Sequence, residues 1–237
     1  HSYFNFSTYN STLGIVEGER DADGNFTYVN RNGDDVTASD SDYRGYKIGF
    51  PHQKINHLRF TSNNYFLLKN GTINADFAFQ NNRRREFGDA TNPDDTELYF
   101  DLNTFNYNVR YNLKESRNWE TSFGIGGMQQ SNTIEGLEAL IPDYDFFDIG
   151  AFVYTQKKFS DKFTLAGGLR FDNRNVDSKE MLEDGDVKFS KFNKNYSGVS
   201  GSLGLSYQLD SKSTLKVNLS RGFRAPNIAE LASNGVH

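Results

Sequence analysis

The chain of 237 residues is rich in aromatic side chains, with 21 Phe and 13 Tyr, yet its mean hydropathy is only −0.71. Its net charge of −5 argues against nucleic acid as a partner, and the absence of cysteine excludes disulfides and thiolate sites. No stretch approaches the roughly 20 apolar residues of a membrane-spanning helix. Much ring surface with little Leu and Val favours strands that meet lipid on one face and water on the other.

Alternation of apolar and polar residues recurs along the chain and predicts about nine antiparallel strands. The expected strands lie near residues 2–13, 53–67, 72–82, 105–112, 119–125, 147–156, 163–172, 199–207 and 213–223. They read as roughly 10 to 15 residues, whereas strands of globular proteins average about 5–6. Their second face carries Asn, Ser, Gln, Arg and Asp, as expected of a wet lumen. A large extended sheet with one solvated face is the alternative interpretation.

The connections between these strands alternate between short and long. Short polar turns are expected at 69–71, 114–117, 160–162 and 210–212, and long polar connections near 14–52, 87–97, 132–144 and 174–193. This pattern is typical of an up-and-down barrel with short periplasmic turns and long outer loops. Aromatic residues gather beside the short turns, where such barrels carry an interfacial girdle: Tyr111, Trp119, Phe159, Phe163 and Tyr207. Nine strands alone leave two unpaired edges, so further strands are expected to close the barrel.

A short segment after the last expected strand carries a family resemblance. Residues 222–226, Gly-Phe-Arg-Ala-Pro, followed by Asn-Ile-Ala-Glu-Leu at 227–231, resemble the FRAP segment of TonB-dependent outer-membrane receptors. Residues 101–104, 147–150 and 167–172 also resemble barrel segments of this family. The resemblance covers essentially the full chain. It implies an all-β, antiparallel up-and-down transmembrane barrel, present here as a partial barrel of about nine long strands.

The same resemblance implies how the chain is organised. Residues 1–237 would form part of the barrel domain, with the plug domain upstream and the C-terminal barrel strands downstream. The missing start Met and the end of the chain in mid-motif agree with this expectation. Energy coupling would then pass through a plug domain that contacts the TonB complex.

The function implied is capture of a scarce nutrient at the outer membrane of a Gram-negative bacterium. The expected cargo is a ferric siderophore or other iron complex, and the expected partners are outer-membrane lipid and the TonB complex, without nucleic acid. A haem receptor and a glycan importer of the same family are alternatives, since loop aromatics stack on sugar rings as well as on a chelate. The aromatic residues considered for this are Tyr43, Tyr46, Phe50, Tyr144 and Phe146. A non-transporting adhesin or sugar-binding β module is the alternative from another class.

The resemblance also indicates candidate site residues at the lip of the barrel. They are Arg221, Phe223, Arg224, Ala225, Pro226, Asn227 and Glu230. Arg224 and Glu230 are expected to organise the lip, while an arginine that pairs with a plug residue, an acidic loop residue or an anionic ligand is the functional alternative. Haem receptors of the family carry an axial His shortly after the motif, which makes His237 a candidate ligand contact.

A run of three arginines, Arg83, Arg84 and Arg85, stands where the strand 72–82 should emerge outside. It is either a solvated strand end or a contact for lipopolysaccharide phosphates or an anionic ligand. The Asp-rich loops have no EF-hand spacing, so no metal site is expected. No nucleophile elbow, HExxH or P-loop occurs. Neither a cofactor nor an enzymatic activity is therefore expected.

Overall fold

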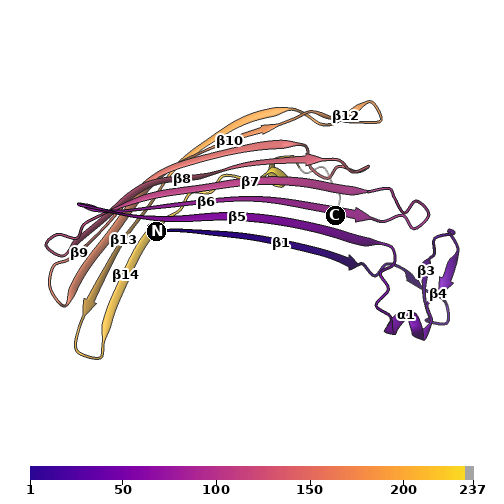
Figure 1. Ribbon diagram of the computed structural model, residues 1–237, viewed down its shortest axis with the longest axis horizontal. Coiled ribbons are helices and arrows are strands. Elements are labelled where there is room, and N and C mark those ends of the chain that lie inside the picture. Colours follow the sequence, from indigo (N-terminus) through magenta and orange to yellow (C-terminus); the bar gives the residue numbers. More distant parts are fainter. Residues whose placement is uncertain (233–237) are drawn as a thin grey trace.

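The computed structural model describes residues 1–232 and contains one large antiparallel sheet of nine strands, strongly curved (Figure 1). The strands are β1 (Ser2–Gly14), β5 (His52–Leu68), β6 (Gly71–Phe87), β7 (Leu98–Leu113), β8 (Trp119–Ile134), β9 (Tyr144–Lys158), β10 (Phe163–Ser178), β13 (Phe192–Gln208) and β14 (Thr214–Arg221). Each pairs with its neighbours in chain order. All except β14 contain 13 to 17 residues. The predicted partial up-and-down barrel is confirmed.

Short turns and long loops lie at opposite ends of the strands (Figure 1). The turns cover residues 69–70, 114–118, 159–162 and 209–213, and the loops cover 15–51, 88–97, 135–143 and 179–191. The longest loops carry structure of their own. The first contains β2 (Glu19–Arg20), β3 (Phe26–Val29), β4 (Asp35–Thr37) and α1 (Asp40–Arg44), and the last contains β11 (Met181–Glu183) and β12 (Asp186–Phe189).

The register places apolar side chains in rows on one face of the sheet, here called the outer face. Phe6 lies opposite Phe60, Phe60 opposite Phe79, and Phe79 opposite Phe105. Directly opposed residues share a face, so these four form one continuous row. Leu203 lies on the same face and is 56% exposed. So much exposed apolar surface is unfavourable in water, whereas hydrocarbon accommodates it.

The apolar part of the outer face, here called the apolar band, occupies the half of the strands nearer the short turns. Its residues include Phe4, Phe6, Leu58, Phe60, Phe77, Phe79, Phe105, Val109, Phe123, Ile125, Val153, Leu169, Phe171, Val199, Leu203, Val217 and Leu219. Towards the long loops the outer face becomes polar, with Asn56, Asn81, Asn103, Asn173 and Asn195. On these strands the apolar band therefore ends before the strand does, whereas on β9 the outer face stays apolar through Ile149 to Phe147.

The opposite, inner face is lined by polar side chains that bond to one another across strands. Gln53 Nε2 donates to Glu86 Oε2 at 2.7 Å, and Asn63 Nδ2 donates to Asp76 Oδ1 at 2.8 Å. Such a hydrogen-bonded wall suits a water-filled lumen, because its polar groups can pair with one another or with water.

Aromatic rings cluster beside the short turns, as the sequence predicts. The ring of Phe163 lies 5.5 Å from that of Phe159 and 6.5 Å from that of Tyr207. The Lys157 ammonium lies 4.5 Å above the Trp119 ring. Amphipathic rings with neighbouring cations are typical of a membrane interface.

Strand β6 extends beyond the end expected from its hydrophobic pattern. The prediction that the strand closes near residue 82 is wrong, because pairing with β5 and β7 continues to Phe87 and Glu86. Outside the apolar band a strand needs partners on both sides rather than an apolar face, so alternation no longer marks its end. The three arginines consequently lie within the sheet.

Candidate ligand-facing surface

The segment after β14 crosses the inner face of the sheet at its loop-side half. Phe223 packs on Gly198 of β13 so closely that a Cβ on Gly198 would lie 2.1 Å from the ring. The Phe223 amide donates to Ser200 Oγ at 3.2 Å. The missing side chain of Gly198 therefore creates the space that holds Phe223.

A compact polar network closes the segment on itself. Arg224 Nη1 donates to Glu230 Oε2 at 2.8 Å, and Arg224 Nη2 contacts the second carboxylate oxygen. The Asn227 amide donates to Glu230 Oε2 at 2.9 Å, and the Glu230 amide donates to Asn227 Oδ1 at 2.9 Å. The charge of Arg224 is thus partnered within the motif. Its role at the lip of the barrel stays a prediction.

The other members of the motif do not converge on this network. Arg221 lies opposite Gly201 at the end of β14, on the outer face. Ala225 and Pro226 lie in the irregular segment that leads into α2 (Ile228–Ala232). Arg221 and Arg224 therefore belong to different faces of the sheet.

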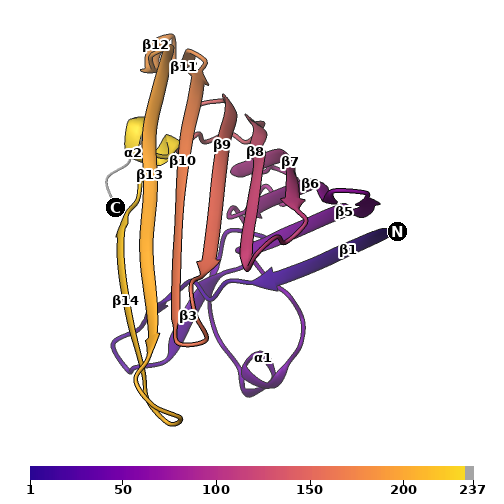
Figure 2. The same ribbon diagram turned by 90° about the vertical axis from the view of Figure 1, so that its left-hand side faces the viewer.

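Helix α2 is anchored by an apolar cluster on the inner face, beside β13 and β10 (Figure 2). Ile228 packs with Tyr144, Phe146 and Val176, which are 6%, 5% and 0% exposed. The prediction that Tyr144 and Phe146 are loop aromatics available for stacking is therefore wrong. Both belong to β9, and α2 covers them.

Beneath this cluster lies an ion pair that sequence reasoning missed. Arg174 Nε and Nη2 donate to the two oxygens of Asp148 at 2.7 and 2.6 Å. The Arg174 guanidinium also lies 5.0 Å from the centre of the Phe146 ring. The sequence pattern placed Asp148 in an alternating strand, but it assigned Arg174 to the long connection expected near 174–193. The two residues lie directly opposite each other on β9 and β10, and the sequence does not show this strand pairing.

The three arginines of β6 separate between the two faces. Arg83 and Arg85 point to the outer face, and Arg84 lies on the inner face, 3.7 Å from the Glu86 carboxylate. Arg83 Nε donates to Asp101 at 2.9 Å. The three do not form a single site for one ligand. The other candidate contact, His237, lies outside the described residues.

Loops 15–51 and 88–97 enclose a cleft of about 930 Å³ at the loop-side end. Its lining includes Glu17, Glu19, Asp21, Tyr28, Asp35, Phe50 and Asp89. Hydrogen bonds from the Thr91 and Asn92 side chains lower the pKa of Asp89 to about 2. The cleft is therefore strongly acidic at neutral pH. The sequence shows that both loops are rich in Asp, but nothing in it shows that the two loops meet.

Within residues 1–232, no group of three or more His, Cys, Asp or Glu side chains is arranged to hold a metal ion. Over the same range, neither helix is long and apolar enough to cross a membrane.

Comparison with known proteins decides the family. The model of the TonB-dependent receptor-like β-barrel matches residues 1–236. This chain belongs to the TonB-dependent receptor β-barrel family. The search of curated proteins found no significant match.

Solved structures of iron and copper transport proteins show the same fold at low sequence identity. The FrpB iron transporter of Neisseria meningitidis has a TM-score of 0.57 at 13% identity, covering 95% of this chain and 37% of its own. The ferric-catecholate import receptor Fiu of E. coli K12 has a TM-score of 0.57 at 12% identity, covering 92% and 44%. The copper transporter OprC has a TM-score of 0.53 at 12% identity, covering 95% and 41%. This receptor chain spans less than half the length of each of these neighbours.

Family membership orients the sheet in the outer membrane of a Gram-negative bacterium. The apolar band of this TonB-dependent receptor meets lipid, and the inner face lines the barrel interior. The short turns are periplasmic, and the long loops are extracellular. The acidic cleft and the inner-face cluster under α2 therefore lie at the extracellular end.

Proposed function

We propose that the full-length receptor imports an iron complex, such as a ferric siderophore, in a step energised by TonB. The observation that carries this proposal is the division of the sheet into an apolar outer face and a hydrogen-bonded polar inner face beneath folded extracellular loops. Membership of the family supports nutrient uptake, and two of the structural neighbours bear iron in their names. The coupling to TonB would run through a plug domain outside this chain.

The extracellular cleft indicates which net charge the proposed cargo should carry. Five carboxylates in its lining would repel an anionic chelate, while the rings of Tyr28 and Phe50 offer apolar contact area. We therefore expect an iron complex that enters through this cleft to be neutral or cationic. The Arg224–Glu230 network would serve on the same side as a fixed part of the lip.

Uptake of labelled iron tests the proposal. A strain that lacks the receptor would be complemented with the full-length gene and supplied with iron-55 bound to neutral, cationic or anionic chelators, in the presence and absence of TonB. We expect iron starvation to raise receptor abundance and TonB-dependent uptake to favour the neutral or cationic complexes.

Other results would overturn the proposal in distinct ways. Induction by a glycan without any response to iron would indicate carbohydrate import, for which the exposed Tyr43 and Tyr46 are the first candidates. Haem uptake would direct attention to His237. Surface attachment that is independent of TonB would indicate an adhesin.

A further inference from the structure

Two positive charges lie side by side on the outer face, close to its extracellular end. Lys54 of β5 is directly opposite Arg85 of β6, and Thr12 of β1 is directly opposite Lys54. Like charges opposed across a ladder destabilise a sheet. Across residues 1–232, neither cation forms an ion pair with a carboxylate. The neighbouring Arg83, by contrast, is neutralised by Asp101.

The two cations border a small polar hollow of about 180 Å³. Thr12, Asn10 and Asn56 complete its lining on this face, and no carboxylate contributes to it. Arg85 Nη2 donates to Asn56 Oδ1 at 2.6 Å, but Arg85 Nε is buried without a hydrogen-bond partner. The hollow therefore holds two cationic side chains and neutral polar groups without a carboxylate to balance the charge.

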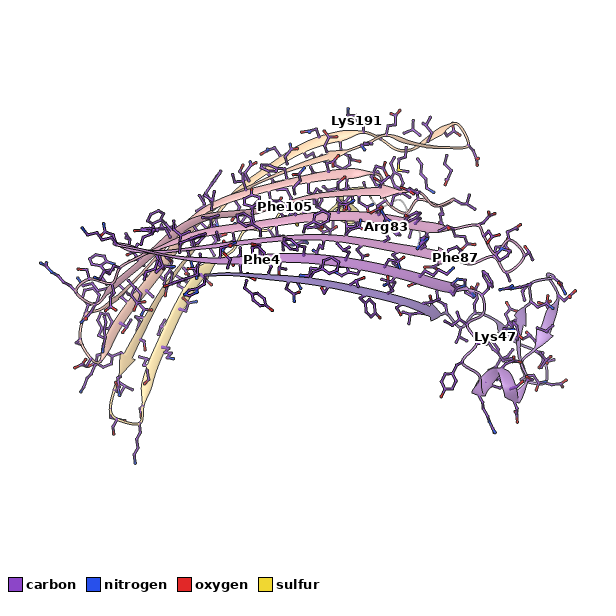
Figure 3. The ribbon with its side chains drawn as sticks, in the orientation of Figure 1. Phe4, Lys47, Arg83, Phe87, Phe105 and Lys191 are labelled. Carbon is purple, nitrogen blue, oxygen red and sulfur yellow. The ribbon has the colours of Figure 1, made fainter. Side chains whose placement is uncertain are left out.

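The height of the hollow matches the lipid headgroups. On β5 the apolar band ends at Leu58, and Lys54 lies four residues further, or about 13 Å along the strand. Figure 3 shows the same order on the neighbouring strands, with Phe4 and Phe105 farther from the long loops than Arg83 and Phe87. The Lys54 ammonium lies 4.7 Å from the centre of the Phe87 ring. This contact holds the ammonium at the height of the lipid headgroups.

We propose that Lys54 and Arg85, with Thr12 and Asn56, bind a phosphate group of an outer-leaflet lipid. The Lys54 ammonium and the Arg85 guanidinium donate to phosphate oxygens, and the phosphate charge also offsets the repulsion between the two cations. The hollow faces outward, away from the barrel interior, and continues the lipid-facing surface of the apolar band. A membrane lipid is therefore its occupant rather than cargo.

Lipid binding by the full-length receptor tests this site. Purified, lipid-stripped receptor would be titrated with lipopolysaccharide and with the same lipopolysaccharide after enzymatic removal of its phosphates, and bound lipid would be counted by native mass spectrometry. We expect the unmodified receptor to prefer the phosphorylated form by about tenfold or more. The double variant Lys54→Gln/Arg85→Gln should lose this preference, and Lys54→Arg should retain it.

A matched control removes two charges from the inner face of the same two strands. Arg59→Gln/Arg84→Gln should keep the preference for phosphorylated lipid. Heat-dependent migration on a denaturing gel reports that each variant is folded. The proposal fails if the double variant retains the preference or if the unmodified receptor shows none. It also fails if inorganic phosphate at the lipid's concentration displaces the lipid completely, since the site would then bind soluble anions.

Discussion

The ring of Phe223 lies against the bare Cα of Gly198, at a distance that leaves no room for a side chain on β13. This contact fixes the point where the chain leaves β14 and turns across the inner face. From there Ile228 reaches the cluster on β9 and β10, and the Arg224–Glu230 network closes. One glycine thereby determines how the motif at the extracellular end is placed.

Substitution of Gly198 by Ala should displace Phe223 from the inner face. The added Cβ would overlap the ring, at a cost of about 1–3 kcal/mol typical of overpacking. Hydrogen exchange in residues 223–232 of the full-length receptor should rise. Gly204→Ala on the same face of β13 is the control, because its Cβ would meet only Asn218 Oδ1 at 3.2 Å and more distant atoms. Equal protection in both variants would contradict this role for Gly198.

The apolar anchor of α2 should contribute more stability than its ion pair. Ile228→Ala removes buried methyl groups, and a loss of about 2–5 kcal/mol in local stability is expected. Glu230→Gln disrupts a pair in which the Arg224 side chain is 69% exposed, so its charge contributes only about 0–1 kcal/mol. Protease susceptibility of the segment after β14 measures both. A larger effect of Glu230→Gln would show that the network, not the cluster, holds α2.

Charge on the apolar band should destabilise the receptor in a bilayer. Leu203→Arg places a guanidinium among outward-facing apolar residues, where a cost of about 2–4 kcal/mol is expected near the bilayer midplane. Ser202→Arg, one residue earlier on the inner face, should cost little. Denaturant unfolding of the full-length receptor in lipid vesicles gives both values. Equal costs would be incompatible with the assignment of the two faces.

Acid should weaken the turn at the start of loop 88–97. Because donors from Thr91 and Asn92 lower the pKa of Asp89 to about 2 from 3.8, its carboxylate stabilises the turn above pH 4. That contribution should fall as the pH drops through about 2. An infrared titration of the receptor minus its Asp89→Asn variant should show a carboxyl band with a midpoint near pH 2. A midpoint near 4 would mean that the Asp89 bonds do not form.

Much of the fold follows from local pattern. Period-2 alternation is a property of each strand alone, so the strands around Phe105 and Leu203 and their outer faces were predictable. The turns were predictable too, because short polar stretches between such strands leave only hairpin connections. The ends of the strands were less predictable, and β6 shows why. Its polar extension at Arg83 is held by pairing with β5 and β7, and the sequence of β6 alone does not show this pairing.

The candidate site depends on contacts between distant segments. Ile228 lies 82 residues after Phe146, and nothing in either local sequence shows that the one covers the other. The acidic cleft joins Glu19 and Asp89 from separate loops in the same way. Gly198 carried no signal either, since its role appears only when Phe223 is placed.

The most direct test of the account is a spin-label scan along β7 of the full-length receptor in lipid vesicles. The chain contains no cysteine, so single cysteines can be introduced at each position from Phe105 to Arg110 without native thiols in this segment. Labels at 105, 107 and 109 should be reached by oxygen from the lipid phase, and labels at 106, 108 and 110 by a water-soluble nickel chelate. Strict alternation would establish this sheet as the wall of a membrane barrel. Equal access of the chelate to both sets would contradict it.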